Sequence, residues 1–198
     1  MQNPKSKIKR VLGINGSARK EGNTDILLDK VLEGASSRGA EIEKIFLSEL
    51  DISPCVESEC EEVASDGSSI IDDDFNSIYH KIDESDVVII ASPIYFGTVS
   101  AQTKAMIDRF QCVWLAKNFK GMKDVFNKKK AGAFLCVSSV HRKDFFDSAK
   151  GVVRHLFATL GIGCKEELFF EGLDAKGVVK GHGDLLDKAY EAGKRLAG

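Results

Sequence analysis

Residues 10–24 read RVLGINGSARKEGNT, and this stretch decides the fold that the sequence predicts. A mostly apolar run, residues 10–14, is followed by a loop rich in glycine and hydroxyl side chains, and then by an amphipathic run to Arg38. This order predicts a strand, a glycine-rich turn and a helix. A phosphate needs accessible backbone N–H groups, small hydroxyls, a cation and a helix N-terminus. We therefore predict that the turn binds a phosphate.

The spacing within this turn argues against better-known phosphate loops. The turn contains neither the GxxxxGK[ST] pattern of nucleoside-triphosphate loops nor the GxGxxG pattern of Rossmann dinucleotide folds. A response-regulator fold is excluded as well, because residues 13–16 place no acidic residue at the end of the first strand. An ordinary polar turn between a strand and a helix stays open as an alternative.

A second loop, residues 92–100, supports the interpretation of the first loop as a phosphate site. Residues 86–91 read DVVIIA, which predicts a strand buried on both faces of a parallel sheet. The strand leads into SPIYFGTVS, residues 92–100, where Ser100 can cap the next helix. Ligands of open α/β sheets lie beyond the carboxyl ends of the strands, so the two loops are expected to be neighbours. A loop with Pro93, two aromatic residues and Gly97 suits a flat polar heterocycle such as an isoalloxazine ring.

Strands and helices alternate along the rest of the chain. Further strands are predicted at 41–47, 130–138 and 163–170, and helices are predicted around 26–35, 106–114, 145–160 and 185–193, the third of these closed by Gly161. Strands 41–47 and 163–170 carry charges and should form the sheet edges. The prediction is a flavodoxin-like α/β three-layer sandwich, a single domain of residues 1–198 with a five-stranded parallel sheet in the order 2-1-3-4-5.

Composition narrows the function classes. The 28 lysines and arginines nearly balance 30 acids, so the net charge of -2 gives no reason to expect a nucleic-acid partner. No stretch approaches the roughly 20 apolar residues of a membrane span, and the first residues are polar, so we expect no membrane insertion and a cytoplasmic location. Five cysteines, an odd number, do not predict a disulfide framework.

The two loops together resemble those of the NAD(P)H-dependent FMN reductase superfamily, most of all its branch of iron-sulfur flavoproteins and quinone-reductase-like proteins. The resemblance covers nearly the whole chain, and its specific parts are GSAR at 16–19, GNT at 22–24, SPIYFG at 92–97, AQTK at 101–104 and IDR at 107–109. It implies an oxidoreductase that passes electrons from NAD(P)H through FMN to a quinone, flavin or protein acceptor, as a homodimer or homotetramer. The alternatives are a flavodoxin-like electron carrier without nicotinamide turnover and a flavin-binding interaction module.

The resemblance also assigns a flavin site. The first loop would hold the FMN phosphate, the second would flank the isoalloxazine ring, and a third loop after strand 130–138 would complete the site. The flavin carries the chemistry, and His141 is the one catalytic candidate, with a solvated surface histidine as its alternative. The predicted cofactor-binding residues are Ser17, Arg19, Asn23, Thr24, Pro93, Ile94, Tyr95, Phe96, Gly97, Thr98, Ser138 and His141.

The cysteine pattern departs from the iron-sulfur branch. A [4Fe-4S] cluster needs four thiolate ligands, whereas the matching stretch of this chain holds only Cys55 and Cys60. We therefore expect no cluster and no other metal, and a Cys55/Cys60 redox pair stays open. Cys112, Cys136 and Cys164 are expected to be small buried residues.

The segment around Cys55 is strongly acidic. Residues 51–74 hold nine acids and no lysine or arginine, and end in three aspartates at 72–74. We expect these aspartates to cap and charge a helix N-terminus. A contact between this segment and the basic residues 117–130 of another subunit is an open alternative.

Overall fold

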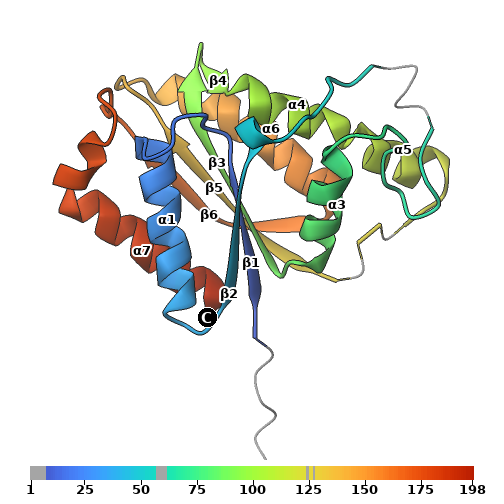
Figure 1. Ribbon diagram of the computed structural model, residues 1–198, viewed down its shortest axis with the longest axis horizontal. Coiled ribbons are helices and arrows are strands. Elements are labelled where there is room, and N and C mark those ends of the chain that lie inside the picture. Colours follow the sequence, from blue (N-terminus) through green and yellow to red (C-terminus); the bar gives the residue numbers. More distant parts are fainter. Residues whose placement is uncertain (1–7, 57–61, 124, 127) are drawn as a thin grey trace, which may run out of the picture.

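The computed structural model describes residues 8–56, 62–123, 125–126 and 128–198. A twisted parallel sheet lies between two layers of helices (Figure 1). The strands are β1 (Arg10–Asn15), β2 (Glu41–Phe46), β3 (Val87–Tyr95), β4 (Thr98–Val99), β5 (Lys130–Val137) and β6 (Ile162–Phe170). The helices are α1 (Asn23–Ser36), α3 (Phe75–Glu84), α4 (Ala101–Arg109), α5 (Gln111–Phe119), α6 (Lys143–Leu160) and α7 (Gly183–Ala197), with short 3-10 turns η1 (Leu47–Glu49) and η2 (Val178–Gly181).

The strand order confirms the flavodoxin-like prediction. The parallel strands follow one another as β2-β1-β3-β5-β6, and the charged strands β2 and β6 are the edges. The sixth strand, β4, was not predicted: it pairs antiparallel with the end of β3. Its two residues are too few to produce a recognisable strand pattern, so the sequence predicted a plain loop there.

Each face of the sheet has its own hydrophobic core. Successive side chains of β3 alternate between them, with Val87 and Ile89 in the core under α1 and α7, and Val88 and Ile90 in the core under α3 to α6. All four are at most 1% exposed, as expected for a central parallel strand covered by helices on both sides.

Helices α1 and α7 pack at unusually short range. A Cβ atom on Gly34 would lie 2.0 Å from the backbone oxygen of Tyr190, and one on Gly193 would lie 1.9 Å from that of Val31. Glycine at both positions allows the two backbones to touch, which fixes α1, and with it the loop before α1, against the C-terminal helix.

The predicted helix 106–114 is in fact two helices. The chain leaves helical geometry at Phe110 (φ −70°, ψ 4°), which ends α4 and starts α5. Neither glycine nor proline marks this break, so the sequence pattern did not reveal it. Gly161 ends α6 with a left-handed conformation (φ 69°), as predicted.

Two of the three remaining cysteines are buried as predicted. Cys112 lies in α5 and Cys136 in β5, both at most 2% exposed. The prediction for Cys164 was wrong, because this residue is exposed. Cys164 lies near the start of the edge strand β6, where the register with β5 shifts between Gly132 and Ala133, and helices cover the edge less completely than the centre of the sheet.

Among the described residues, no helix combines the length and the apolar character needed to cross a membrane.

Candidate functional site

The first loop, residues 16–22, joins β1 to α1 at the carboxyl edge of the sheet. Gly22 precedes the helix with extended backbone (φ −78°, ψ 170°). The N–H groups of Asn23 and Thr24 therefore begin α1 without acceptors inside the helix. The side chains of Ser17 and Thr24 are buried, while Arg19 is exposed beside them. The loop thus presents N–H donors, hydroxyls and a guanidinium in one place, as an anion requires.

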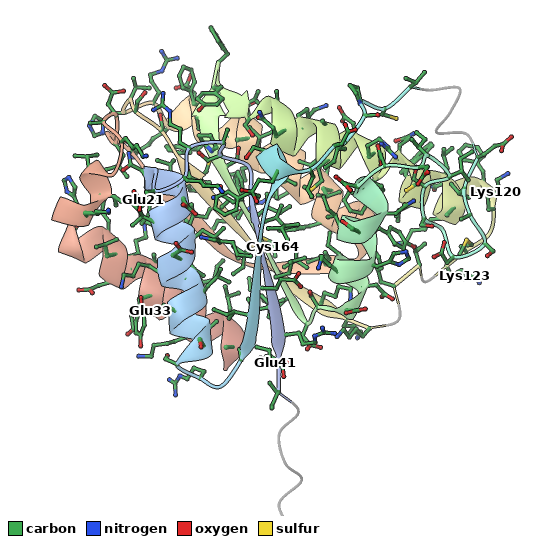
Figure 2. All side chains as sticks on the ribbon, in the orientation of Figure 1. Glu21, Glu33, Glu41, Lys120, Lys123 and Cys164 are labelled. Carbon is green, nitrogen blue, oxygen red and sulfur yellow. The ribbon has the colours of Figure 1, made fainter. Side chains whose placement is uncertain are left out.

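Buried Asp25 holds this loop in shape. One carboxylate oxygen accepts hydrogen bonds from Asn15 Nδ2 (3.0 Å) and Lys44 Nζ (2.9 Å), and the other accepts from the N–H of Glu21 (2.8 Å). Glu21 lies just before α1 (Figure 2) with a left-handed backbone (φ 57°), which this bond helps to maintain. Burial alone lowers the pKa of Lys44, but hydrogen bonds to Asp29 and Asp25 outweigh it and leave that pKa raised. Lys44 therefore stays charged and offsets the charge of Asp25.

The second loop is a β-hairpin that continues β3. Tyr95 lies opposite Thr98, and the two turn residues between them, Phe96 and Gly97, have positive φ angles of 50° and 78°. Two positive φ angles are typical of the tight turns that join antiparallel strands. A positive φ is strained for an aromatic residue, and the Phe96 ring is fully exposed. The hairpin tip therefore carries an aromatic side chain into solvent.

Hydrogen bonds join the first loop to β3 and to the residue that caps α4. The N–H of Gly16 donates to Ala91 O (2.8 Å), and Ser100 Oγ donates to Gly16 O (2.7 Å). Ser100 caps α4 as predicted, because its Oγ also accepts from the N–H of Thr103 (3.2 Å). A Cβ atom on Gly16 would lie 1.9 Å from Thr103 Oγ1. The two loops are consequently neighbours, and glycine is needed where they meet.

The third loop follows β5 and bonds mostly to itself and to β6. Ser138 Oγ donates to Val140 O (2.9 Å) and accepts from the N–H of the same residue (3.2 Å). His141 Nδ1 lies 3.2 Å from Glu171 Oε2, and the histidine side chain is 78% exposed. Both predicted residues of this loop therefore lie at the carboxyl edge of the sheet, with His141 open to solvent.

A cleft of about 180 Å³ joins these loops. The predicted residues of the first loop line it together with residues 93–95, whereas the hairpin tip at 96–98, Ser138 and His141 lie outside its lining. Residues 173–176, after β6, form a further wall that was not predicted, because this segment has no recognisable binding motif. The lining residues are Ser17, Arg19, Gly22, Asn23, Thr24, Pro93, Ile94, Tyr95, Val137, Ser139, Leu173, Asp174 and Lys176.

The acidic segment is anchored to α4. The fully buried guanidinium of Arg109 forms an ion pair with Asp73, and also donates to Ser53 O (3.1 Å) and Ser69 Oγ (2.8 Å). The three aspartates were predicted to cap a helix, and Asp73 Oδ1 does accept from the N–H of Phe75, the first residue of α3 (3.0 Å). The ion pair between Asp73 and a buried arginine was not predicted.

The sequence left open a contact between this acidic segment and the basic residues 117–130 of another subunit. Several of its lysines are bonded within their own chain instead. Lys117 Nζ donates to Thr159 O (2.7 Å), Lys128 Nζ lies 2.8 Å from Asp86 Oδ1, and Lys130 Nζ donates to Ser85 O (3.0 Å). These bonds hold the three side chains against their own chain, and the ion pair with Asp86 offsets the charge of Lys128.

The described cysteines do not fit an iron-sulfur cluster. Cys55 is disulfide-bonded, while Cys112, Cys136 and Cys164 are free thiols on separate elements. Burial raises the pKa of Cys112 to about 12 and also raises that of Cys136, which disfavours the thiolates that iron requires. Among the described residues, no three or more His, Cys, Asp and Glu side chains are grouped to hold a metal. Cys60 lies outside the described residues, so a Cys55/Cys60 redox pair stays an open alternative.

The fold and the cleft define a flavodoxin-like domain in which a loop with N–H donors, hydroxyls and a guanidinium lies beside an aromatic hairpin, at the carboxyl edge of β1 and β3. Residues 9–162 match the family model described as NADPH-dependent FMN reductase. The chain therefore belongs to the NADPH-dependent FMN reductase family.

Individual relatives agree with this family. The chain is 41% identical to an iron-sulfur flavoprotein of Methanocaldococcus jannaschii over 100 residues, which are 50% of this chain and 51% of that protein. It is 28% identical to a Bacillus subtilis protein provisionally named NAD(P)H-dependent FMN-containing oxidoreductase, over 94% of this chain and 96% of that protein. A solved flavone reductase shares the fold, with a TM-score of 0.72, 20% identity and coverage of 95% of this chain and 62% of that one. The match covers only 44% to 62% of the length of three iron-sulfur flavoproteins to which the chain is similar.

The groups that line the cleft fit the phosphate end of FMN. Ser17 and Thr24 supply hydroxyls, Arg19 supplies a cation, and the start of α1 supplies N–H donors. The side chain of Asn23 is used elsewhere, because it is bonded to residues 173–179, so this residue would reach a phosphate through its backbone N–H.

Proposed function

We propose that this protein is an FMN-dependent oxidoreductase that takes electrons from NAD(P)H and passes them to a quinone, flavin or protein acceptor. The observation that carries the proposal is the cleft in which Ser17, Arg19 and Thr24 meet residues 93–95. Membership of the NADPH-dependent FMN reductase family supports the choice of cofactor and donor.

Each part of the cleft would have its own task. Ser17, Arg19 and Thr24 would bind the phosphate, while residues 93–95 would flank the ring. The hairpin tip at 96–98 and the loop holding Ser138 and His141 would border the ring and the substrate. Bound FMN would supply the redox chemistry itself. Backbone N–H groups around residues 95–97 would stabilise negative charge on the reduced ring.

An anaerobic absorption titration tests this proposal. The full chain is loaded with FMN and titrated with NADPH and, separately, with NADH. The proposal predicts loss of the flavin absorbance at a rate compatible with turnover, followed by recovery on addition of a quinone or free flavin. A bound flavin that stays oxidised would indicate an electron carrier with another donor, and failure to bind any flavin would refute the assignment of both loops.

We further propose that the protein carries no iron-sulfur cluster, in contrast to its iron-sulfur relatives. The buried, separated thiols of Cys112 and Cys136 and the disulfide at Cys55 support this. Iron and acid-labile sulfide are measured after anaerobic purification. Stoichiometric amounts of both would contradict the proposal.

We propose a homodimer or homotetramer as the working assembly. Exposed aromatic side chains support this, among them Trp114 (40% exposed) and Phe119 (68%), which border a largely apolar hollow of about 690 Å³ between α4, α5 and α6. Light scattering coupled to gel filtration gives the mass, and a monomer at micromolar concentration would refute the proposal.

We also propose a cytoplasmic location for this protein, which cell fractionation tests.

A further inference from the structure

One buried side chain, that of Asn23, holds the segment between β6 and α7 against the first loop, which we call the phosphate loop (residues 16–22). Asn23 Nδ2 donates to Leu173 O (3.1 Å) and to Ala175 O (2.9 Å), and Asn23 Oδ1 accepts from the N–H of Val179 (3.2 Å). Asn23 is 8% exposed, so its amide satisfies these backbone groups away from water. The first residue of α1 therefore decides where a segment about 150 positions later in the chain must lie.

Two further contacts fix the course of this segment. The N–H of Leu173 donates to Ser138 O (3.1 Å), which ties the segment to the third loop as well. Gly177 turns the chain with a left-handed backbone (φ 72°), and a Cβ atom there would lie 3.6 Å from Glu21 O in the phosphate loop. In Figure 1 the segment lies beside the upper end of α1. Residues 173–176 are consequently held as a wall of the cleft.

This wall adds a second cation to the cleft. Lys176 lines it together with Arg19, and the wall also contributes the carboxylate of Asp174. In the part of the chain that the structure describes, neither Arg19 nor Lys176 forms an ion pair, whereas neighbouring Lys20 and Lys44 are paired with Glu49 and Asp25. A phosphate monoester carries a charge of about −1.5 to −2 at neutral pH, which one guanidinium does not neutralise. Because Asp174 offsets one positive charge, Arg19 alone would leave the cleft without net charge, and Lys176 makes it positive.

We propose that Lys176 binds the phosphate of FMN alongside Arg19 and makes the cleft selective for FMN over riboflavin. This rests on the proposed flavin site. The ammonium group of Lys176 would act as a flexible point charge, in contrast to the fixed fork of Arg19. Asn23 has an indirect role, because its hydrogen bonds hold residues 173–176 in place and so keep Lys176 within reach of the phosphate.

Titration of the flavin-free full chain with FMN and with riboflavin tests this, with quenching of flavin fluorescence as the signal. Lys176→Gln should weaken FMN binding about tenfold, the loss of one charge-assisted contact, and should leave riboflavin binding within about twofold of wild type. Lys176→Arg keeps the charge and should bind FMN nearly as well as the wild type. Lys180→Gln is the matched control, because this exposed lysine lies four positions later and does not line the cleft. Asp174→Asn should tighten FMN binding, since it removes a carboxylate from the cleft.

The outcomes separate this proposal from the proposed function. FMN binding by Lys176→Gln at the wild-type level, or an equal loss for FMN and riboflavin, would overturn the role of Lys176 while the flavin site stands. Weaker FMN binding by Asp174→Asn would also overturn it, because the shape of the wall rather than its charge would then control affinity. A wild-type chain that binds neither flavin would overturn both proposals.

Discussion

Substitution of Gly16 by alanine probes the contact between the first loop, residues 16–22, and α4. The added Cβ atom would lie 1.9 Å from Thr103 Oγ1, and 3.1 Å from both Ala91 O and Ser100 Oγ. The nearest atom must therefore move by more than 1 Å to reach an ordinary contact distance. Thr103 is fully buried, so this movement disturbs packed neighbours. Overpacking of this kind costs about 2–3 kcal/mol.

Urea unfolding of the flavin-free chain measures this cost. Gly16→Ala should lower the free energy of unfolding by about 2–3 kcal/mol and weaken FMN binding, because it displaces the loop that we propose holds the phosphate. Thr103→Ala removes the clashing oxygen and should by itself cost about 1 kcal/mol, the value of one buried hydrogen bond. The double variant should be more stable than the sum of the two losses predicts, by at least about 1 kcal/mol.

Gly151→Ala in α6 is the matched control, because a Cβ atom there meets nothing within 4 Å. It should keep or raise stability, by up to about 1 kcal/mol, as a glycine-to-alanine change inside a helix does. A Gly16→Ala protein within about 0.5 kcal/mol of wild type would refute the steric reasoning. Additive losses in the double variant would show that Thr103 is not the obstacle.

Three further substitutions test other contacts. Arg19→Ala should weaken FMN binding by about 1–3 kcal/mol in a calorimetric titration, and unchanged affinity would remove Arg19 from the phosphate site. Burial alone raises the pKa of Asp73, but hydrogen bonds from Arg109 and from the N–H groups of Ser53 and Phe75, together with the charge of Arg109, outweigh it and leave that pKa lowered. The stability that Asp73 contributes is therefore complete above its unfolded pKa of about 3.9 and is lost as the pH falls through the lower folded pKa. Asp73→Asn should cost about 3 kcal/mol at pH 7 by leaving Arg109 unpaired and should flatten the acid limb of a stability-against-pH curve; an unchanged limb would contradict this. Gly193→Ala should cost about 3 kcal/mol in urea unfolding, because the clashing atom on α1 is backbone and cannot rotate away; wild-type stability would show that α1 and α7 separate easily.

Local sequence patterns were sufficient for the order of elements. The apolar run of 86–91, the charged strands at the edges, the cap at Ser100 and the stop at Gly161 each depend on residues close together in the chain, and the structure confirms all four. The break at Phe110 was missed for the same reason, because no glycine or proline marks it and only packing between α4 and α5 produces it.

The sequence by itself determined the fold class and the residue types of the first loop, since periodicity, charge and turn chemistry are short-range properties. Only the tertiary structure decided which distant groups complete the cleft and which anchor the acidic segment. Asn23 bonds to Ala175 across 152 positions, and Arg109 pairs with Asp73 across 36. Such partners are selected by the geometry of buried donors and acceptors, which must be satisfied once water is excluded. That requirement acts between neighbours in space, and a linear pattern does not record it.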